Sequence, residues 1–401
     1  MRCCGSPGMI CLLCIVAYVF ALDSAAAGGT SPEPNAPKAE IRTPKPPQTP
    51  RINGPSIFAV RPGHPFLYLI PATGARPMEF SVESLPAGLA VDARTGQITG
   101  SLKEAGEHIV TLRAKNALGA SEKKFKIVVG ETIALTPPMG WNSWNAYHGS
   151  VTGENVIHAA RAMASSGLIQ HGWTYINIDD AWQSKRGGPF NAIQPNEKFP
   201  DFQKMCDKIH ALGLKVGIYS TPWTTSYARY IGGSSDDPNG DWSKGGGRRN
   251  GKVSFAEADA RQWAAWGIDY LKYDWNPNQT TPRETSEMFH QDTDTMRKAL
   301  RNCGRDIIFS YSNGMRFDDI ADQSKMLNCW RTTGDIGDSW QSMASKAFYV
   351  DIPRGQTEPA RPSERPLGRL RRPRPLERSR HDGPGCSQLR RQTTPDSPHA
   401  R

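Results

Sequence analysis

Short apolar runs alternate with turn residues over the first third of the chain. Six runs rich in β-branched and aromatic residues cover 57–60, 66–70, 79–82, 89–91, 108–113 and 124–129. Short strands separated by turn residues at this spacing are typical of a β-sandwich. The pattern therefore predicts an all-β domain over residues 51–130.

From Pro137 onward, strand-like and helix-like segments alternate. The strand-like segments end within 139–144, 175–180, 216–219, 271–274, 307–312 and 327–330, and helical patterns cover 153–168, 201–212, 254–266 and 282–302. Thr152-Gly-Glu-Asn indicates a helix start, and Ser254-Phe-Ala-Glu is a candidate capping box. This succession favours a parallel barrel over an open sheet. It predicts a (β/α)8-type TIM barrel over 132–350, of which about six βα units can be placed.

Polar and aromatic side chains gather where these strands end. They are Trp144, Asp179, Asp180, Tyr219, Lys272, Asp274, Ser312, Arg331 and Asp335. A single aspartate after a strand often only caps the next helix. Four aspartates with a lysine and an arginine on successive strand ends favour an active site, because barrel enzymes place theirs at this rim.

Two of the aspartates suit glycoside hydrolysis, which uses a pair of carboxyl groups. Asp274 follows Lys272 on a buried strand, and an adjacent cation is expected to keep a nucleophilic carboxylate ionised. Asp335 follows a Thr-Thr-Gly turn, where an acid/base group can reach solvent. The two carboxyl groups should face each other across roughly 5–6 Å. In the alternative assignment Asp338 is the acid and Asp335 caps the helix that begins near Ser339.

The remaining site residues suit recognition of a sugar. Asp179 and Asp180 would accept hydrogen bonds from hydroxyl groups, and Trp144 would cover the apolar face of a sugar ring.

Five ordered motifs resemble glycoside hydrolase family 27, mainly α-galactosidases, over roughly residues 132–350. They lie at 136–144, 178–182, 213–219, 271–275 and 330–340. The resemblance implies a retaining mechanism with Asp274 as nucleophile and Asp335 as acid/base. It also implies that Asp179, Asp180, Lys272 and Arg331 hold the galactose hydroxyls, with no cofactor and no metal.

One departure from the family bears on specificity. Where familiar α-galactosidases end the fifth strand in Cys-Glu-Trp, this chain has Tyr311-Ser312-Asn313. The small Ser312 keeps α-N-acetylgalactosaminidase and β-L-arabinopyranosidase open beside α-galactosidase.

Residues 85–100 resemble bacterial Ig-like modules that accompany extracellular enzymes. Such a module either binds sugars or surfaces or serves as a spacer, and the spacer role is favoured.

The N-terminus predicts secretion. An apolar run of 14 residues over 9–22 follows a positive start and precedes the small residues of 23–27. The run is short for a bilayer span, so residues 1–27 are expected to be a signal peptide, and the product to be secreted or periplasmic without stable membrane insertion. The Pro-rich residues 28–50 are predicted to be a linker.

Net charge is +10 over 401 residues, but residues 352–401 hold twelve arginines, no lysine and five acids. The first 351 residues therefore carry only +3, which gives no reason to expect nucleic-acid binding.

Permitted codons of 376–385, read one base later, encode Trp-Asn-Asp-Pro-Asp-Met-Met-Val-Leu, which resembles the family's next strand-end motif. We therefore expect a frameshift between roughly 349 and 365, with 351–401 a disordered, out-of-frame tail and strands seven and eight missing.

Cysteine usage predicts neither a required disulfide nor a metal site. Of eight cysteines, four lie in the signal segment and one in the tail, which leaves Cys206, Cys303 and Cys329.

The expected partners are galactose-containing oligo- or polysaccharides, and the sequence leaves the oligomeric state open. A different class also remains open: an inactive secreted carbohydrate-binding protein, if truncation abolishes catalysis.

Overall fold

The computed structural model describes residues 45–242, 247–275, 282–312, 320–331, 334–337 and 339–347. The predicted signal peptide, most of the linker and the tail at 351–401 lie outside these ranges. The described residues from Pro46 onward belong to one compact unit. Among the described helices, none has the length and apolar character needed to cross a membrane.

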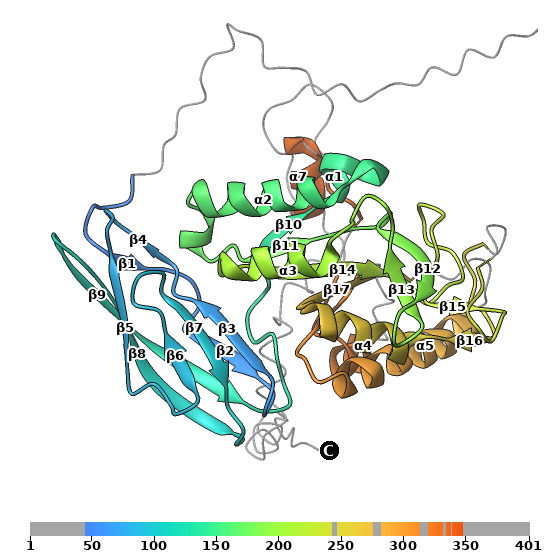
Figure 1. Cartoon of the computed structure of the whole chain (residues 1–401), viewed down its shortest axis with the longest axis horizontal. Helices are drawn as coiled ribbons and strands as arrows, with labels where there is room; N and C mark the ends of the chain where they lie inside the picture. The colour runs from blue at the N-terminus through green and yellow to red at the C-terminus, as the bar shows by residue number, and fades with distance from the viewer. Residues whose placement is uncertain are drawn as a thin grey trace, which may run out of the picture. The chain divides into compact units, whose positions relative to one another are not determined.

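The first part of this unit is the predicted β-sandwich, drawn in blue to cyan in Figure 1. One sheet has the order β2 (Ile57–Val60), β9 (Gly119–Val129), β8 (Gly106–Asn116) and β5 (Glu79–Glu83). The other has the order β3 (Pro65–Leu69), β7 (Gln97–Ser101) and β6 (Leu89–Val91), and β1 (Arg51–Ile52) pairs with β4 (Ala72–Thr73). Ile98, Leu112 and Ile127 are fully buried in its core.

All six predicted runs form strands, but the prediction missed the two-residue strands β1 and β4, and also β7. Its Gly100 has φ +137°, and a Cβ there would lie 2.0 Å from the carbonyl oxygen of Gly88. This close backbone approach requires glycine, which depresses the strand signal of the segment.

The second part is a parallel half-barrel of six strands. Their order is β10 (Gly140–Asn142), β11 (Tyr175–Asn177), β14 (Lys215–Ser220), β17 (Tyr270–Tyr273), β18 (Ile308–Tyr311) and β19 (Cys329–Trp330). Each strand falls in a segment predicted from the sequence. In the described part of the chain, β10 and β19 are the edges of this sheet.

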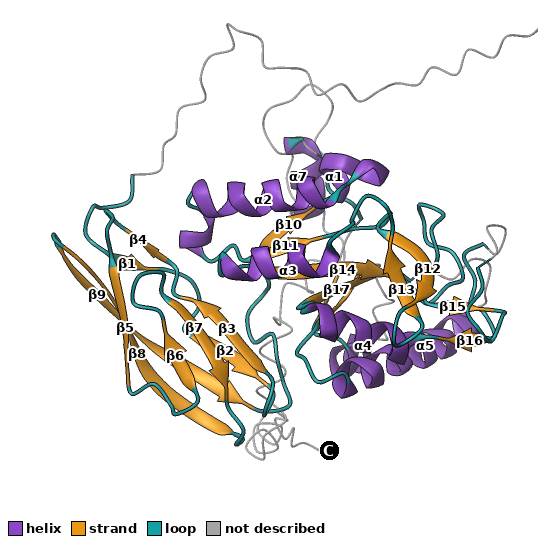
Figure 2. Cartoon of the chain, viewed as in Figure 1, coloured by secondary structure: helices purple, strands orange, loops and turns teal. Residues whose placement is uncertain are grey.

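Helices connect these strands, as Figure 2 shows in purple and orange. They are α1 (Trp144–Tyr147), η1 (His148–Ser150), α2 (Gly153–Ser165), η2 (Leu168–His171), α3 (Phe202–Ala211), α4 (Ala256–Trp266), α5 (Pro282–Asn302), α6 (Ile320–Met326) and α7 (Trp340–Ala347). One face of the sheet, with Ile176, Ile218 and Leu271, shares a core with residues of α2 to α5. The opposite face carries Tyr219 and Lys272, together with a small apolar cluster that includes Tyr175 and Ile308.

Helices begin at both predicted starts, but only one of the two has a capping box. Thr152 forms a capping box with Asn155 at the start of α2. The N-cap of α4 is Phe255, whose side chain makes no capping hydrogen bond, while Ser254 Oγ accepts a hydrogen bond of 3.4 Å from the backbone N–H of Ala256. Ser254 belongs to strand β16, where its backbone pairs with Ser234, so strand pairing takes precedence over the capping pattern.

The sequence did not predict two hairpins that interrupt the alternation. One joins β12 (Gln183–Gly187) and β13 (Ala192–Pro195), and the other joins β15 (Ser234–Ser235) and β16 (Val253–Ser254). The first is held to α4 by a buried ion pair, in which Arg186 Nη1 lies 2.7 Å from Asp259 Oδ1. Asp259 also accepts a hydrogen bond from the backbone N–H of Ile193.

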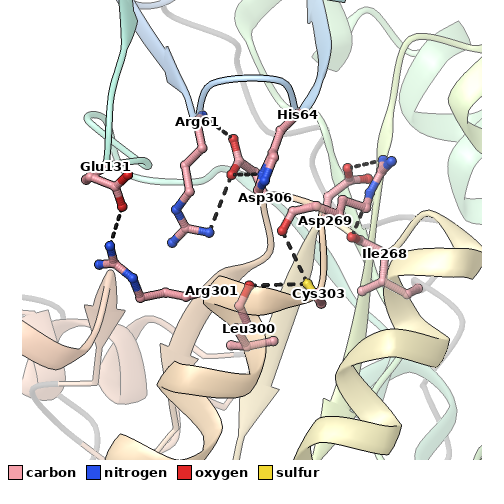
Figure 3. Close-up of polar contacts among 10 residues, drawn as sticks. Arg61, His64, Glu131, Ile268, Asp269, Leu300, Arg301, Cys303 and Asp306 are labelled. Carbon is pink, nitrogen blue, oxygen red and sulfur yellow. Dashed lines mark hydrogen bonds and ion pairs between the residues drawn. The ribbon is translucent and has the colours of Figure 1, made fainter. Parts of the chain in front are cut away.

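Polar contacts join the sandwich to the half-barrel (Figure 3). Asp306, which precedes β18, accepts hydrogen bonds of 2.8 Å from the backbone N–H of Arg61 and contacts His64 Nδ1 at 2.8 Å. Glu131 pairs with Arg301. These contacts lie at the amino-terminal ends of the barrel strands, whereas the predicted site lies at the carboxyl ends.

The buried Arg186–Asp259 pair should make a large contribution to stability. Replacing Asp259 by Ala leaves a guanidinium without its partner in the interior, which typically costs about 3–5 kcal/mol. Urea unfolding should show this loss of unfolding free energy for Asp259→Ala.

The matched control is Glu107→Ala. Glu107 pairs with Lys126 at 2.7 Å, but its side chain is 58% exposed, and exposed pairs contribute less than about 1 kcal/mol. Equal losses in the two variants would contradict the prediction.

Candidate active site

Asp274 follows the last residue of β17, and its side chain is buried. Its backbone N–H donates to the carbonyl of Ser220 at the end of β14, at 3.0 Å. Burial raises the pKa of Asp274 to about 6, while Lys272 and Tyr219 lower it and Asp179 raises it. Tyr219 lies beside the carboxylate, although its hydroxyl makes no hydrogen bond of ordinary geometry.

The expected effect of Lys272 on Asp274 is present, but it does not decide the net pKa of Asp274. Lys272 does favour the ionised form, but the loss of hydration outweighs that effect. The ammonium group of Lys272 instead bonds directly to Asp179, with Nζ 2.7 Å from Oδ2. Asp274 therefore shares this cation with a second carboxylate and does not receive its full effect.

Asp179 and Asp180 lie just beyond β11 and are both buried. The backbone N–H of Asp179 donates to Ser143 Oγ at 2.9 Å. Asp180 accepts hydrogen bonds from the backbone N–H groups of Ala181 and Ala228, at 2.7 and 2.8 Å. Burial raises the pKa of Asp180 and these hydrogen bonds lower it, so backbone donors take the role that a cation takes for Asp179.

The backbone at this point is unusual. Ala181 has φ +81°, a left-handed conformation that is uncommon for residues other than glycine. Backbone strain of this kind clusters at functional sites. Here it belongs to the turn that presents the carboxylate of Asp180.

Ser312 and Arg331 extend the same edge. The backbone N–H of Ser312 donates to the carbonyl of Tyr273, and that of Arg331 donates to the carbonyl of Tyr311. Ser312 is buried. Arg331 is close enough to lower the pKa of Lys272, whose net pKa is raised by Asp179 and Asp274 despite the opposing effect of burial.

Asp335 differs from the other carboxyl groups because its side chain is 87% exposed. Its Oδ1 lies 2.8 Å from Arg331 Nη1. The next residue, Ile336, accepts a hydrogen bond from Asn145 Nδ2 at 3.5 Å. This contact brings the Asp335 segment to α1, which begins at Trp144.

The alternative in which Asp335 caps the following helix receives no support from the contacts. Ser339 Oγ accepts a hydrogen bond from the backbone N–H of Ser342 in the first turn of α7. Asp338, the other candidate acid, lies outside the described residues.

The structure thus brings Asp179, Asp180, Tyr219, Lys272, Asp274, Ser312 and Arg331 to one edge of the sheet. Trp144 is half-buried, with its ring in an edge contact with His148. Sequence reasoning missed Ser143, Gln183 and Ala228, which support the two adjacent aspartates. Ser143 and Gln183 lie in or next to the quoted motifs, but the backbone N–H of Ala228 has no sequence signal.

Cys206, Cys303 and Cys329 are free. Within the described ranges, no cluster of His, Cys, Asp and Glu has an arrangement that could hold a metal ion.

Comparison with known proteins identifies the two parts of the chain. The profile of the family described as "Alpha galactosidase A" matches residues 136–360, about 56% of the chain, and that of the "Putative Ig domain" matches residues 49–130. An alpha-galactosidase of Coffea arabica is 36% identical over 232 residues, which cover 57% of this chain and 55% of the relative. Alpha-galactosidase A of Cellvibrio japonicus is 35% identical over 223 residues, covering 55% and 48%.

A solved structure from Bacteroides fragilis, described as "a putative alpha-galactosidase", extends the likeness. It matches with a TM-score of 0.64 and 36% identity, over 75% of this chain and 60% of that one. The match covers more than the residues of the galactosidase profile, so it includes residues outside the barrel. This chain spans about half the length of the curated relatives named above.

The raised pKa of Asp274 should make stability depend on pH. Because the folded pKa is about 6 and the ordinary value is 3.8, the folded state holds this proton more tightly than the unfolded state. Stability is therefore lost as pH rises between these values. Asp274→Asn should be more stable than the parent by about 3 kcal/mol at pH 7.5, and by about half of that at pH 5.

Urea unfolding at the two pH values measures both differences. A stability difference that is the same at pH 5 and pH 7.5 would show that the burial of this carboxylate is not what the variant relieves.

Proposed function

Because this chain belongs to the alpha-galactosidase A family, with an Ig-like module before the family domain, we propose that it is a retaining exo-glycosidase acting on terminal α-D-galactosyl residues. The observation that carries this proposal is the pair of Asp274, buried at a strand end beside Lys272, and Asp335, exposed on the segment that contacts α1. A buried nucleophile and a solvent-accessible acid/base are the two groups that double displacement needs. The expected separation of roughly 5–6 Å between their carboxyl groups is part of the proposal.

In the first step, Asp274 Oδ attacks the anomeric carbon while the carboxyl group of Asp335 gives its proton to the departing glycosidic oxygen. The glycosyl–Asp274 ester then reacts with water, from which Asp335 takes a proton, and the sugar leaves with its original configuration. Asp179, Asp180, Lys272 and Arg331 would hold the sugar hydroxyls, and Trp144 would cover the ring. Tyr219 would limit the access of water to Asp274.

The proposed substrates are galactose-containing oligo- and polysaccharides, and the proposed location is outside the cytoplasm, by way of the predicted signal peptide. Ser312 keeps a second specificity in view. Its small, buried side chain at the end of β18 leaves room beside the sugar, as an N-acetylgalactosaminidase would need. p-Nitrophenyl glycosides of galactose, N-acetylgalactosamine and arabinopyranose separate these specificities.

The non-catalytic alternative is a carbohydrate-binding protein. It is supported by the exposure of Asp335, which within the described residues has no enclosing wall. Galactoside binding without turnover would favour this alternative over the enzyme.

Replacing the nucleophile tests the mechanism. In the frame-restored protein, which is the parent for these measurements, Asp274→Asn should lower turnover of p-nitrophenyl α-galactoside at least about 1,000-fold and leave galactose binding nearly unchanged. In the parent, kcat/KM should rise with pH through an apparent pKa near 6, because the nucleophile must be ionised. Steady-state kinetics from pH 4 to 8 give both results.

The exposed Asp207 of α3 provides the matched control, since Asp207→Asn should keep turnover within about twofold of the parent. Proton NMR of the first-formed product should show the α anomer. Net inversion, or an active Asp274→Asn enzyme, would contradict the proposal.

The expected frameshift bears directly on whether this chain is active. The match to the family profile ends at residue 360, inside the window of 349–365. Sequencing codons 345–401 in the gene and the transcript should reveal the shift, and restoring the frame should restore hydrolysis. A single intact frame in the transcript, or full hydrolytic activity of the 401-residue chain, would contradict this prediction.

A further inference from the structure

A cavity of about 300 Å³ lies between the sandwich and the amino-terminal ends of the barrel strands. Phe58, Leu67 and Leu69 line it from the sandwich, and Ile133 and Ile308 line it from the barrel. None of the candidate active-site residues contributes to its wall. Its volume lies at the lower end of the range of small-molecule sites.

The feature that distinguishes this cavity is Lys215, the first residue of β14. Its Nζ lies 4.5 Å from the ring centre of Phe58 and 5.8 Å from that of Tyr175. Among the described residues, the structure gives this ammonium group no hydrogen-bond acceptor and no ion-pair partner. Burial lowers the pKa of Lys215, while the more distant Asp269 and Asp306 raise it and Arg305 lowers it.

The two carboxylates in the wall are already engaged. Asp269 pairs with Arg305 at 2.6 Å and with His210 at 2.9 Å, and it accepts the backbone N–H of Val216. Asp306 is held by the Arg61 backbone and by His64. Lys215 is therefore the cation in this wall whose charge is met by aromatic rings and not by oxygen.

We propose that this cavity binds a monocarboxylate with an apolar body. The carboxylate would accept a hydrogen bond from Lys215 Nζ, and the apolar body would lie against Phe58, Leu69 and Ile133. Arg305 in the wall is already paired with Asp269, so the single charge of Lys215 suits a monoanion better than a phosphate dianion. Because both modules line the site, the ligand would also strengthen their association. The site is independent of the proposed hydrolase activity.

Isothermal titration calorimetry of the full chain with octanoate tests this proposal, with octan-1-ol as the neutral probe of similar shape. Octanoate should bind saturably at one site and at least about tenfold more tightly than octan-1-ol, because a charge-assisted hydrogen bond is lost in the alcohol. Lys215→Met should weaken octanoate at least about tenfold and leave octan-1-ol unchanged.

Lys198→Met is the matched control. Lys198 Nζ also lies over an aromatic ring, 5.4 Å from the ring centre of Tyr230, but outside the cavity, so octanoate affinity should not change. Lys215→Gln keeps a polar side chain but removes the charge; it should also weaken octanoate at least about tenfold, which keeps the test valid if Lys215→Met does not fold. Equal affinity for the two probes, no saturable octanoate binding, or unchanged affinity in both cavity variants would overturn the proposal.

Discussion

Parallel pairing in a common register is the constraint on which the candidate site depends. Tyr219 of β14 pairs with Lys272 of β17, so both side chains point to the same face of the sheet. Side chains alternate along a strand, and a slip of one residue would turn Asp274 toward the helices. Gly217 helps to fix the register, because a Cβ there would lie 1.9 Å from Asn177 Oδ1 on the neighbouring strand.

This register gathers charge that the fold compensates unevenly. Asp179 is paired with Lys272, and Asp180 is surrounded by backbone donors. Asp274 is the least compensated of the three, and its pKa is raised to about 6 as a result. A network that served stability alone would gain by pairing all three carboxylates. The unequal arrangement is typical of catalytic sites, where a pKa is displaced toward the working pH.

The sequence predicted the elements that follow regular hydrophobic periods. Six strand segments, four helices and the residues at the strand ends could be placed, because an alternating βα pattern determines which ends meet. β7 and the two hairpins were missed, since glycine at a close backbone contact and short polar strands give weak signals. The Ser254 capping pattern was misleading because backbone pairing with Ser234 takes that residue into a strand.

The sequence predicted which residues form the site better than it predicted how their charges affect one another. Adjacency in sequence placed Lys272 near Asp274, but whether a cation or burial controls a pKa depends on depth and on competing carboxylates. Here Asp179 takes the direct bond to Lys272. Likewise, the backbone N–H of Ala228 reaches Asp180 through a loop 48 residues further along the chain, a contact that no local pattern reveals.

The two ends of the barrel strands are used differently. At the amino-terminal ends, Asp269 and Asp306 have arginine and histidine partners, and they join the barrel to its own connections and to the sandwich. At the carboxyl ends, Lys272 bonds directly to Asp179, and Asp274 has no direct cationic partner of its own among the described residues. In parallel barrels the first arrangement serves stability and the second serves chemistry. Lys215 is an exception to this division. Its ammonium group has no carboxylate partner among the described residues, although it lies at the end where Asp269 and Asp306 are paired. This unpaired charge is the reason for proposing that the cavity around Lys215 is a binding site and not a packing defect.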